Sequence, residues 1–315
     1  MSNLPRVHTQ HSALSAQHSF TVRVPATSAN LGPGFDALGM ALGLANEVEV
    51  YPGEPVAVEV RDEGRGELSS GSDNLVYCAI RRVAERLGAP GPDVRLCCRN
   101  AIPLARGLGS SSAAIVAGLL AGNRLYSDPL TTSQLLDFAV EIEGHPDNVT
   151  PALLGGLRVC VRGKDGMVQT AVQLAHPLQA VLFVPDFPME TEAARALLPA
   201  RVPLGDAVYN LGRAALFVTA IAGGNYSLLR EATLDRLHQP ARSALFPQMS
   251  AFFQAALQAG ALGAFLSGAG STLLALVDHE AEAVEGAFAA TAAREGVGGR
   301  TLVVAAAGEG ARVLP

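Results

Sequence analysis

The chain has 315 residues, of which 49% are hydrophobic and none is tryptophan, and its formal net charge is −6. This length and composition predict an ordered globular protein of two domains with an aliphatic core. The acidic balance and the lack of a basic run argue against a nucleic-acid partner.

The N-terminal residues 1–18 are polar and are expected to form a tail. They contain no basic segment followed by an apolar one, so we expect no secretory signal. No stretch reaches the roughly 18 uninterrupted apolar residues of a membrane span, so we expect no membrane partner. The cysteines (Cys78, Cys97, Cys98 and Cys160) show neither a C-x-x-C pair nor metal-ligand spacing, which favours buried thiols in a reducing cytoplasm.

The first elements are a strand and a long loop. Residues 20–24 alternate as in a strand, and residues 25–39 form a segment rich in glycine and proline that is typical of a loop. Asn30 and Asp36 stand among apolar neighbours in this loop. Either both cap local turns, or the amide and the carboxylate meet a polar ligand.

Strands are then predicted at residues 45–51, 56–60 and 94–98, with a helix that starts after Asp73 or Asn74 and ends near Leu87. Either of these two polar residues is an ordinary N-cap candidate.

The next segment, residues 103–114, has the sequence PLARGLGSSSAA and leads into an apolar helix that ends near Tyr126. Glycines allow a close backbone approach to a ligand, and a helix N-terminus favours an anion, so the segment predicts a phosphate site. It is not a P-loop, because no Lys follows Gly109, and it is not a Rossmann loop, because Ser112 stands where the third Gly would be. An ordinary capped helix is the alternative.

A helix over residues 135–143 is expected after the capping segment 131–134. Glu141 and Glu143 lie at its C-terminal end, where a carboxylate opposes the helix dipole, so they are either solvated or kept there for another reason. The loop expected at residues 144–151 carries His145, Asp147 and Asn148 together, a density that favours a functional role.

The second half reads as strands at residues 157–161, 168–172 and 179–184, and then a helix that opens on Thr191. Helices over residues 209–222 and 246–259 follow, then a strand, a glycine-rich turn and a strand over residues 264–277. A helix at 281–295 and a strand at 299–306 end the series. Arg195 and Arg242 are either surface cations or the pair that grips a carboxylate.

Three loops together resemble the three motifs of the GHMP small-molecule kinases: residues 25–36 (PATSANLGPGFD), 103–114, and 267–272 (SGAGST). Within that superfamily, the first loop and the segment HPDNV at residues 145–149 resemble the homoserine kinases. The resemblance runs from about residue 20 to residue 304. Thr150 departs from it, since the family often has Ala there, and the segment QPAR at 239–242 lacks the aromatic residue usual before the arginine.

The resemblance implies an α+β fold of two domains after the tail at residues 1–18. An ATP-binding GHMP N-terminal domain, similar to domain 2 of ribosomal protein S5, would span residues 19–165. A ferredoxin-like GHMP C-terminal domain would span residues 166–315.

The resemblance also implies ATP and Mg²⁺ as cofactors. Asn74 would contact the adenine, and Ser111 with Glu141 would hold the magnesium ion, with Glu143 as an open alternative. The triphosphate would lie on the serine loop, whose residues in this role are Pro103, Arg106, Gly107, Leu108, Gly109, Ser110, Ser111 and Ser112.

For the second substrate, L-homoserine, the implied contacts are Asn30, Asp36, His145, Asp147, Asn148, Arg195 and Arg242. The two arginines would hold the carboxylate and Asp36 the ammonium group. Asp147 and Asn148 would hold the hydroxyl, with Arg195 and Thr191 completing the catalytic set. Whether Asp147 is a general base or a hydrogen-bond acceptor stays open.

The expected activity is therefore phosphorylation of L-homoserine by ATP in threonine biosynthesis, in the cytoplasm. A mevalonate- or sugar-type GHMP kinase and a non-catalytic nucleotide-binding protein are the alternatives. A homodimer is expected by analogy alone.

Overall fold

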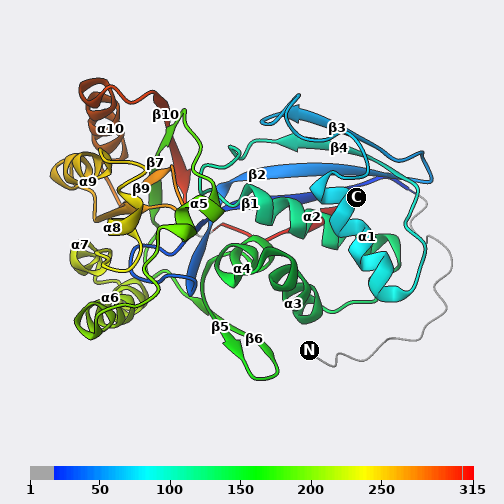
Figure 1. Cartoon of the computed structure of the whole chain (residues 1–315), viewed down its shortest axis with the longest axis horizontal. Coiled ribbons are helices and arrows are strands. Elements are labelled where there is room, and N and C mark those ends of the chain that lie inside the picture. The colour runs from blue at the N-terminus through cyan, green and yellow to red at the C-terminus, as the bar shows by residue number, and fades with distance from the viewer. Residues whose placement is uncertain (1–17, 307) are drawn as a thin grey trace.

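The computed structural model describes residues 18–306 and 308–315. They form two halves that lie side by side, each a β-sheet with helices packed on it (Figure 1). Of the tail predicted at residues 1–18, residues 1–17 lie outside the described residues. Within the described residues, no helix is both long enough and apolar enough to cross a bilayer.

The larger half contains a seven-stranded sheet with the order β11-β1-β2-β4-β3, while β5 pairs with β2 and β6 with β5. All pairs are antiparallel except β3–β4. The long strand β2 makes this branching possible, since its start pairs with β5 and its end with β4. The strands are β1 Phe20–Ala29, β2 Leu38–Pro52, β3 Ala57–Asp62, β4 Val94–Asn100, β5 Leu157–Gly163, β6 Gly166–Val172 and β11 Arg312–Leu314.

Helices cover one face of this sheet (Figure 1). They are α1 Leu75–Leu87, α2 Ser110–Leu125, α3 Thr132–Glu143 and α4 Pro146–Leu154. Helix α2 is the central one, and it contacts β1 as well as the other three helices. Its small and aliphatic residues let these neighbours approach closely: a Cβ on Gly118 would lie 2.3 Å from the Val76 carbonyl oxygen.

The smaller half contains an antiparallel four-stranded sheet with the order β10-β7-β9-β8. Its strands are β7 Gln179–Pro185, β8 Gly263–Leu266, β9 Leu273–Val277 and β10 Gly299–Ala305. Its helices are α5 Thr191–Ala196, α6 Leu204–Gly223, η1 Tyr226–Leu228, α7 Leu229–Ala232, α8 Gln239–Arg242, α9 Met249–Gln258 and α10 Ala281–Glu295.

The two faces of this small sheet bury different cores. Along β7, Ala180 and Leu182 belong to a core shared with α6 and with the larger half. Val181 and Phe183 belong to a second core with α9 and α10. This alternation follows from the two-residue period of a strand. As a result, one face of the small sheet packs against the larger half and forms the interface between the two halves.

Two segments expected as loops are regular structure. The expected loop at residues 144–151 is wrong, because residues from Pro146 onwards form α4. Pro146 stands at the start of this helix, where a missing N–H costs nothing. The expected loop at 25–39 is wrong in its first five residues, which continue β1 past a register shift between Pro25 and Ala26, and in its last two, which begin β2.

The division of the chain also differs from the expected one. Residue 165 falls in the β5–β6 hairpin, and β6 belongs to the larger sheet. The C-terminal strand β11 returns to pair with β1. By sheet membership the larger half therefore runs to about Val172 and takes up the last residues of the chain again.

Candidate active site

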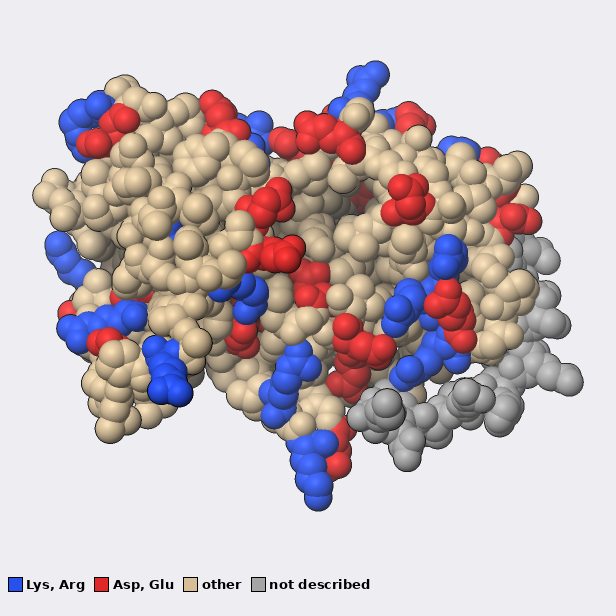
Figure 2. Space-filling model, viewed as in Figure 1, with Lys and Arg blue, Asp and Glu red and all other residues tan. Residues whose placement is uncertain are grey.

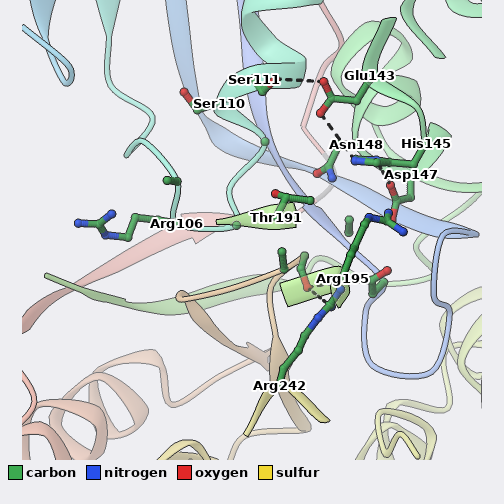
Figure 3. A pocket seen from close by; sticks show the side chains of 17 residues that line it. Arg106, Ser110, Ser111, Glu143, His145, Asp147, Asn148, Thr191, Arg195 and Arg242 are labelled. Atoms are coloured by element: carbon green, nitrogen blue, oxygen red, sulfur yellow. Dashed lines mark hydrogen bonds and ion pairs between the residues drawn. The ribbon is translucent and has the colours of Figure 1, made fainter. Parts of the chain in front are cut away.

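A cavity of about 100 Å³ lies where the halves meet, and Figure 3 shows the side chains that line it. It adjoins a larger cavity of about 550 Å³, which also reaches Asn74. Figure 2 shows the surface hollowed between the two halves, with acidic side chains along the hollow. The smaller cavity gathers most of the expected site residues: Asn30, Arg106, Gly107, Gly109, Ser110, Ser111, His145, Asp147, Asn148, Thr191, Arg195 and Arg242.

The serine loop, residues 103–112, is held by its carbonyl groups. Four consecutive carbonyls accept hydrogen bonds from other segments, three from the smaller half and one from β1. From the smaller half, Met189 N donates to Ala105 O (3.0 Å), Thr272 N to Arg106 O (3.1 Å) and Ser267 Oγ to Gly107 O (2.7 Å). From β1, Thr27 N donates to Leu108 O (3.1 Å).

The backbone N–H groups of the same loop have no hydrogen-bond acceptors in the part of the chain that the structure describes. Among the described residues, none accepts a hydrogen bond from the backbone amides of residues 106–112. Helix α2 starts after Gly109, which has φ 72°, and no side chain caps it. The alternative of an ordinary side-chain-capped helix is therefore wrong. Free amides at a helix N-terminus beside a cavity suit an anion.

Two residues expected at the nucleotide have other partners. Arg106 points away from the site (Figure 3), and its guanidinium donates to the carbonyls of Pro185, Asp186 and Leu104. Asn74 caps α1, since its Oδ1 accepts from Val76 N and its Nδ2 donates to Ser69 O.

Pro103 lines neither of the two cavities, and Leu108 and Ser112 are buried behind the loop. The loop therefore presents backbone amides to the cavity, with Ser110 and Ser111 as its side-chain hydroxyls there.

The carboxylate that contacts this loop is Glu143. Its two oxygens accept from Ser111 Oγ (3.1 Å) and Ser112 Oγ (2.7 Å). Glu141 lies elsewhere on α3, where its Oε1 is 3.3 Å from Nη2 of Arg82. Residues two apart on a helix face nearly opposite sides, so only one of the two can reach the serines. The geometry therefore favours Glu143, the open alternative, over Glu141 as the carboxylate beside the serine loop.

The start of α4 supplies a buried polar cluster. His145 Nδ1 lies 2.9 Å from Asp147 Oδ1, and its Nε2 lies 4.0 Å from Glu143 Oε1. Burial alone would lower the pKa of His145, but the hydrogen bond to Asp147 and the charges of Asp147 and Glu143 raise it above its ordinary value. Asn148 Oδ1 accepts from Thr27 Oγ1 at 2.8 Å, which ties α4 to β1. The polar residues expected in this segment do meet at the cavity (Figure 3).

The two charged residues expected at opposite ends of the amino acid pair with each other. Arg195 Nη2 and Nη1 donate to Asp36 Oδ1 (2.6 Å) and Oδ2 (3.1 Å). The ring of Phe35 lies beside both arginines, 5.3 Å from Arg195 Cζ and 5.6 Å from Arg242 Cζ. Neither arginine is a surface cation, since Arg242 is 1% exposed and Arg195 is half-buried.

Asn30 shapes this region rather than standing free in it. Its Oδ1 accepts from Asp36 N (3.1 Å), and its Nδ2 donates to Gly268 O (2.9 Å). The bond to Asp36 N supports the capping alternative for Asn30, which also lines the cavity. Thr191 opens α5 and lies between the two cavities.

Two buried asparagines escaped the sequence reasoning. Asn46 on β2 and Asn100 at the end of β4 line the larger cavity. Asn46 Oδ1 accepts from Ala101 N and Ile102 N, both at 2.9 Å, and its Nδ2 has no partner among the described residues. One sequence signal could have identified Asn46. In the alternating pattern of this strand it occupies the same inward face as Val48, where a polar amide is unusual.

Comparison with known proteins agrees with this architecture. The family model "GHMP kinases N terminal domain" matches residues 74–156, and the model "GHMP kinases C terminal" matches residues 217–294. The homoserine kinase of Desulfitobacterium hafniense is 44% identical over 93% of this chain and 99% of its own length. That of Synechococcus sp. is 45% identical over 93% and 97%.

Solved structures give the same result. A homoserine kinase from Cytophaga hutchinsonii superposes with a TM-score of 0.84 at 31% identity, over 95% of this chain and 98% of that one. A mevalonate kinase from L. major shares the fold at 17% identity, with a TM-score of 0.71. The predicted two-domain α+β fold is confirmed, and the chain belongs to the GHMP kinases, within them to the homoserine kinase family.

Proposed function

We propose that this chain transfers the γ-phosphoryl group of ATP to the hydroxyl of L-homoserine, giving O-phospho-L-homoserine in threonine biosynthesis, and that it works in the cytoplasm. One observation carries the proposal. The free amides of the serine loop share a cavity with Arg195 and Arg242, and Arg195 is paired with Asp36, so an anion site adjoins charges of both signs. That combination suits a triphosphate beside a zwitterion.

ATP would occupy both cavities. The triphosphate lies on the amides of residues 106–112, and the nucleoside enters the cavity of about 550 Å³. The apolar wall of that cavity includes Val48, Val60 and Cys98, on the sheet face that also carries Asn46. The unpaired Nδ2 of Asn46 is the polar group that this wall offers to the base.

The residues present fit a magnesium ion. Mg²⁺ prefers oxygen ligands and is usually held by one or two carboxylates together with substrate phosphates and water. Ser111 Oγ and Glu143 supply such oxygens next to the phosphate cradle. No group of three or more His, Cys, Asp or Glu suited to a metal occurs in the described residues. When bound, the ion would neutralise charge on the transferring phosphoryl group.

Homoserine would separate the Asp36–Arg195 pair. Its ammonium replaces Arg195 at Asp36, and its carboxylate replaces Asp36 at Arg195, so the one ion pair within the protein is replaced by two ion pairs to the substrate. Arg242 supplies a second cation within the same cavity. Burial, and then the charge of Arg195, lower the pKa of Arg242 to about 10, so it stays protonated at neutral pH.

The acceptor hydroxyl would lie against Asp147. One oxygen of this carboxylate is taken by His145, and the other has no partner among the described residues. Asp147 therefore orients the hydroxyl toward the phosphoryl group by accepting its hydrogen bond. Phosphoryl transfer depends mainly on such positioning and on charge neutralisation, which the amide cradle provides.

A coupled assay of ADP release with L-homoserine, mevalonate and galactose tests the proposal against a mevalonate- or sugar-type kinase. We expect turnover of homoserine at least about a hundredfold above the others, since a neutral sugar leaves Asp36 and both arginines unused. Equal turnover of all three, or none of homoserine, contradicts it. ATP binding without turnover of any alcohol would favour a non-catalytic nucleotide-binding protein.

A further inference from the structure

Arg242 lines the cavity, and one edge of its guanidinium has no hydrogen-bond partner among the described residues. Its Nη1 donates twice, to His238 Nδ1 and to Gly268 O, both at 2.9 Å. Its Nε is buried and has no hydrogen-bond partner. No described residue accepts from Nη2. The N–H groups on the Nε and Nη2 side are therefore unpaired, in a residue that lines the site (Figure 3).

His238 is fixed in one tautomer by its two partners. Its Nε2 lies 2.7 Å from Gly32 O, and a carbonyl only accepts, so Nε2 carries the proton. Its Nδ1 faces Arg242, and a guanidinium only donates, so Nδ1 is the acceptor. The ring is fully buried. The contacts thus require a neutral imidazole.

The charges around the ring agree with this state. Burial lowers the pKa of His238, and the Arg242 charge lowers it further, whereas Asp235 opposes the shift. Asp235 Oδ2 lies 3.6 Å from Nε2. Its two oxygens already accept four hydrogen bonds, from Asn210 Nδ2 and the backbone amides of residues 237, 238 and 239. Asp235 therefore caps the backbone amides at the start of α8 and is not the counter-ion of a charged imidazole.

We propose that His238 is a positioning residue for substrate specificity: it holds Nη1 of Arg242 inward, so that the Nε–Nη2 edge receives both oxygens of the homoserine carboxylate. The inference rests on the proposed function. Two parallel N–H donors bind a carboxylate bidentately, which adds both energy and geometric specificity. His238 and Arg242 together also link the loop that contains Gly32, bonded to His238, to the turn that contains Gly268, bonded to Arg242.

Removing the acceptor at Nδ1 leaves one Nη1 hydrogen unpaired in the protein interior, which is costly. The guanidinium then turns toward a new acceptor, and the carboxylate-binding edge leaves its place. Replacing His238 with Gln or with Asn separates loss of the Nδ1 acceptor from loss of the imidazole ring. The Gln amide nitrogen reaches toward Gly32 but places no acceptor at Nδ1, whereas Asn Oδ1 replaces the Nδ1 acceptor and loses the Gly32 bond.

The experiment compares wild type, His238→Gln and His238→Asn in the full chain, with L-homoserine and with 3-amino-1-propanol, which is homoserine without its carboxylate. We expect His238→Gln to raise the KM for homoserine about tenfold, with kcat and the KM for ATP within about twofold. His238→Asn should stay within about threefold. With 3-amino-1-propanol the three proteins should have equal kcat/KM.

The proposal is overturned if the two variants behave alike, if the KM for ATP rises as much as that for homoserine, or if the aminoalcohol suffers the same loss. Should a variant not fold, nitrogen NMR of the wild-type imidazoles at pH 7 decides, because a charged or Nδ1-protonated His238 contradicts it. A wild type that does not phosphorylate homoserine refutes the proposed function instead, and the NMR result still tests the His238 geometry.

Discussion

Replacing Gly107 with alanine tests the phosphate cradle. A Cβ at Gly107 would lie 2.1 Å from the Ser267 carbonyl oxygen and 2.9 Å from Gly270 N, both backbone atoms that cannot swing away. Its φ of 71° adds the cost of a left-handed conformation, about 1–2 kcal/mol. Overpacking adds about 1–3 kcal/mol. We expect Gly107→Ala to lower the free energy of unfolding by about 2–5 kcal/mol in total, as measured by urea titration.

Gly53 provides the matched control. Its φ is 76°, and a Cβ there meets nothing within 4 Å. Gly53→Ala should therefore cost only the conformational part, about 1–2 kcal/mol, and leave turnover unchanged. In Gly107→Ala the loop must move away from the smaller half, so an amide donor is misplaced and kcat should fall about 10²–10³-fold. Equal destabilisation in the two variants, or full activity of Gly107→Ala, would refute the reasoning.

Three further outcomes are expected. Glu143→Gln should raise the Mg²⁺ concentration needed for half-maximal rate by about tenfold or more, whereas Glu141→Gln should not, and the reverse result would restore Glu141 as the ligand. Asn46→Leu should raise the KM for ATP and leave that for homoserine unchanged; unchanged ATP kinetics would remove Asn46 from the nucleoside site. Because burial lowers the pKa of His238, the unfolded chain takes up its proton first as pH falls below about 6.5. This group should then lower the free energy of unfolding by up to about 1.4 kcal/mol per pH unit. Urea titrations at a series of pH values should show a weaker dependence of this free energy on pH for His238→Gln than for wild type.

The sequence allowed much of the site to be predicted, because its chemistry is concentrated in short segments. Gly107 and Gly109 mark positive φ, and they stand before a run of hydroxyls at a helix start. The polar cluster after Gly144 is dense enough to be noticed, although its prolines suggested a loop. They were misleading because Pro146 begins a helix as readily as it interrupts one.

What could not be predicted depends on contacts between distant segments. Glu141 and Glu143 differ only in which side of α3 meets α2, and spacing along one helix does not contain that information. The guanidinium of Arg106 binds carbonyls of the smaller half, some 80 residues away in the chain. Asn46 resembles a routine strand residue until the amides of Ala101 and Ile102 occupy its oxygen.

The anchoring of the serine loop bears on how this protein can be divided. Two separate family models match residues 74–156 and 217–294, which suggests two independent modules. Yet three of the four carbonyls that orient the loop are bonded to the smaller half, through Met189, Thr272 and Ser267. A fragment containing only the larger half would carry every glycine and serine of the motif without the partners that aim its amides. We therefore expect a fragment of either half alone to lack nucleotide affinity, and the affinity to appear only when fragments of the two halves are combined and form their interface.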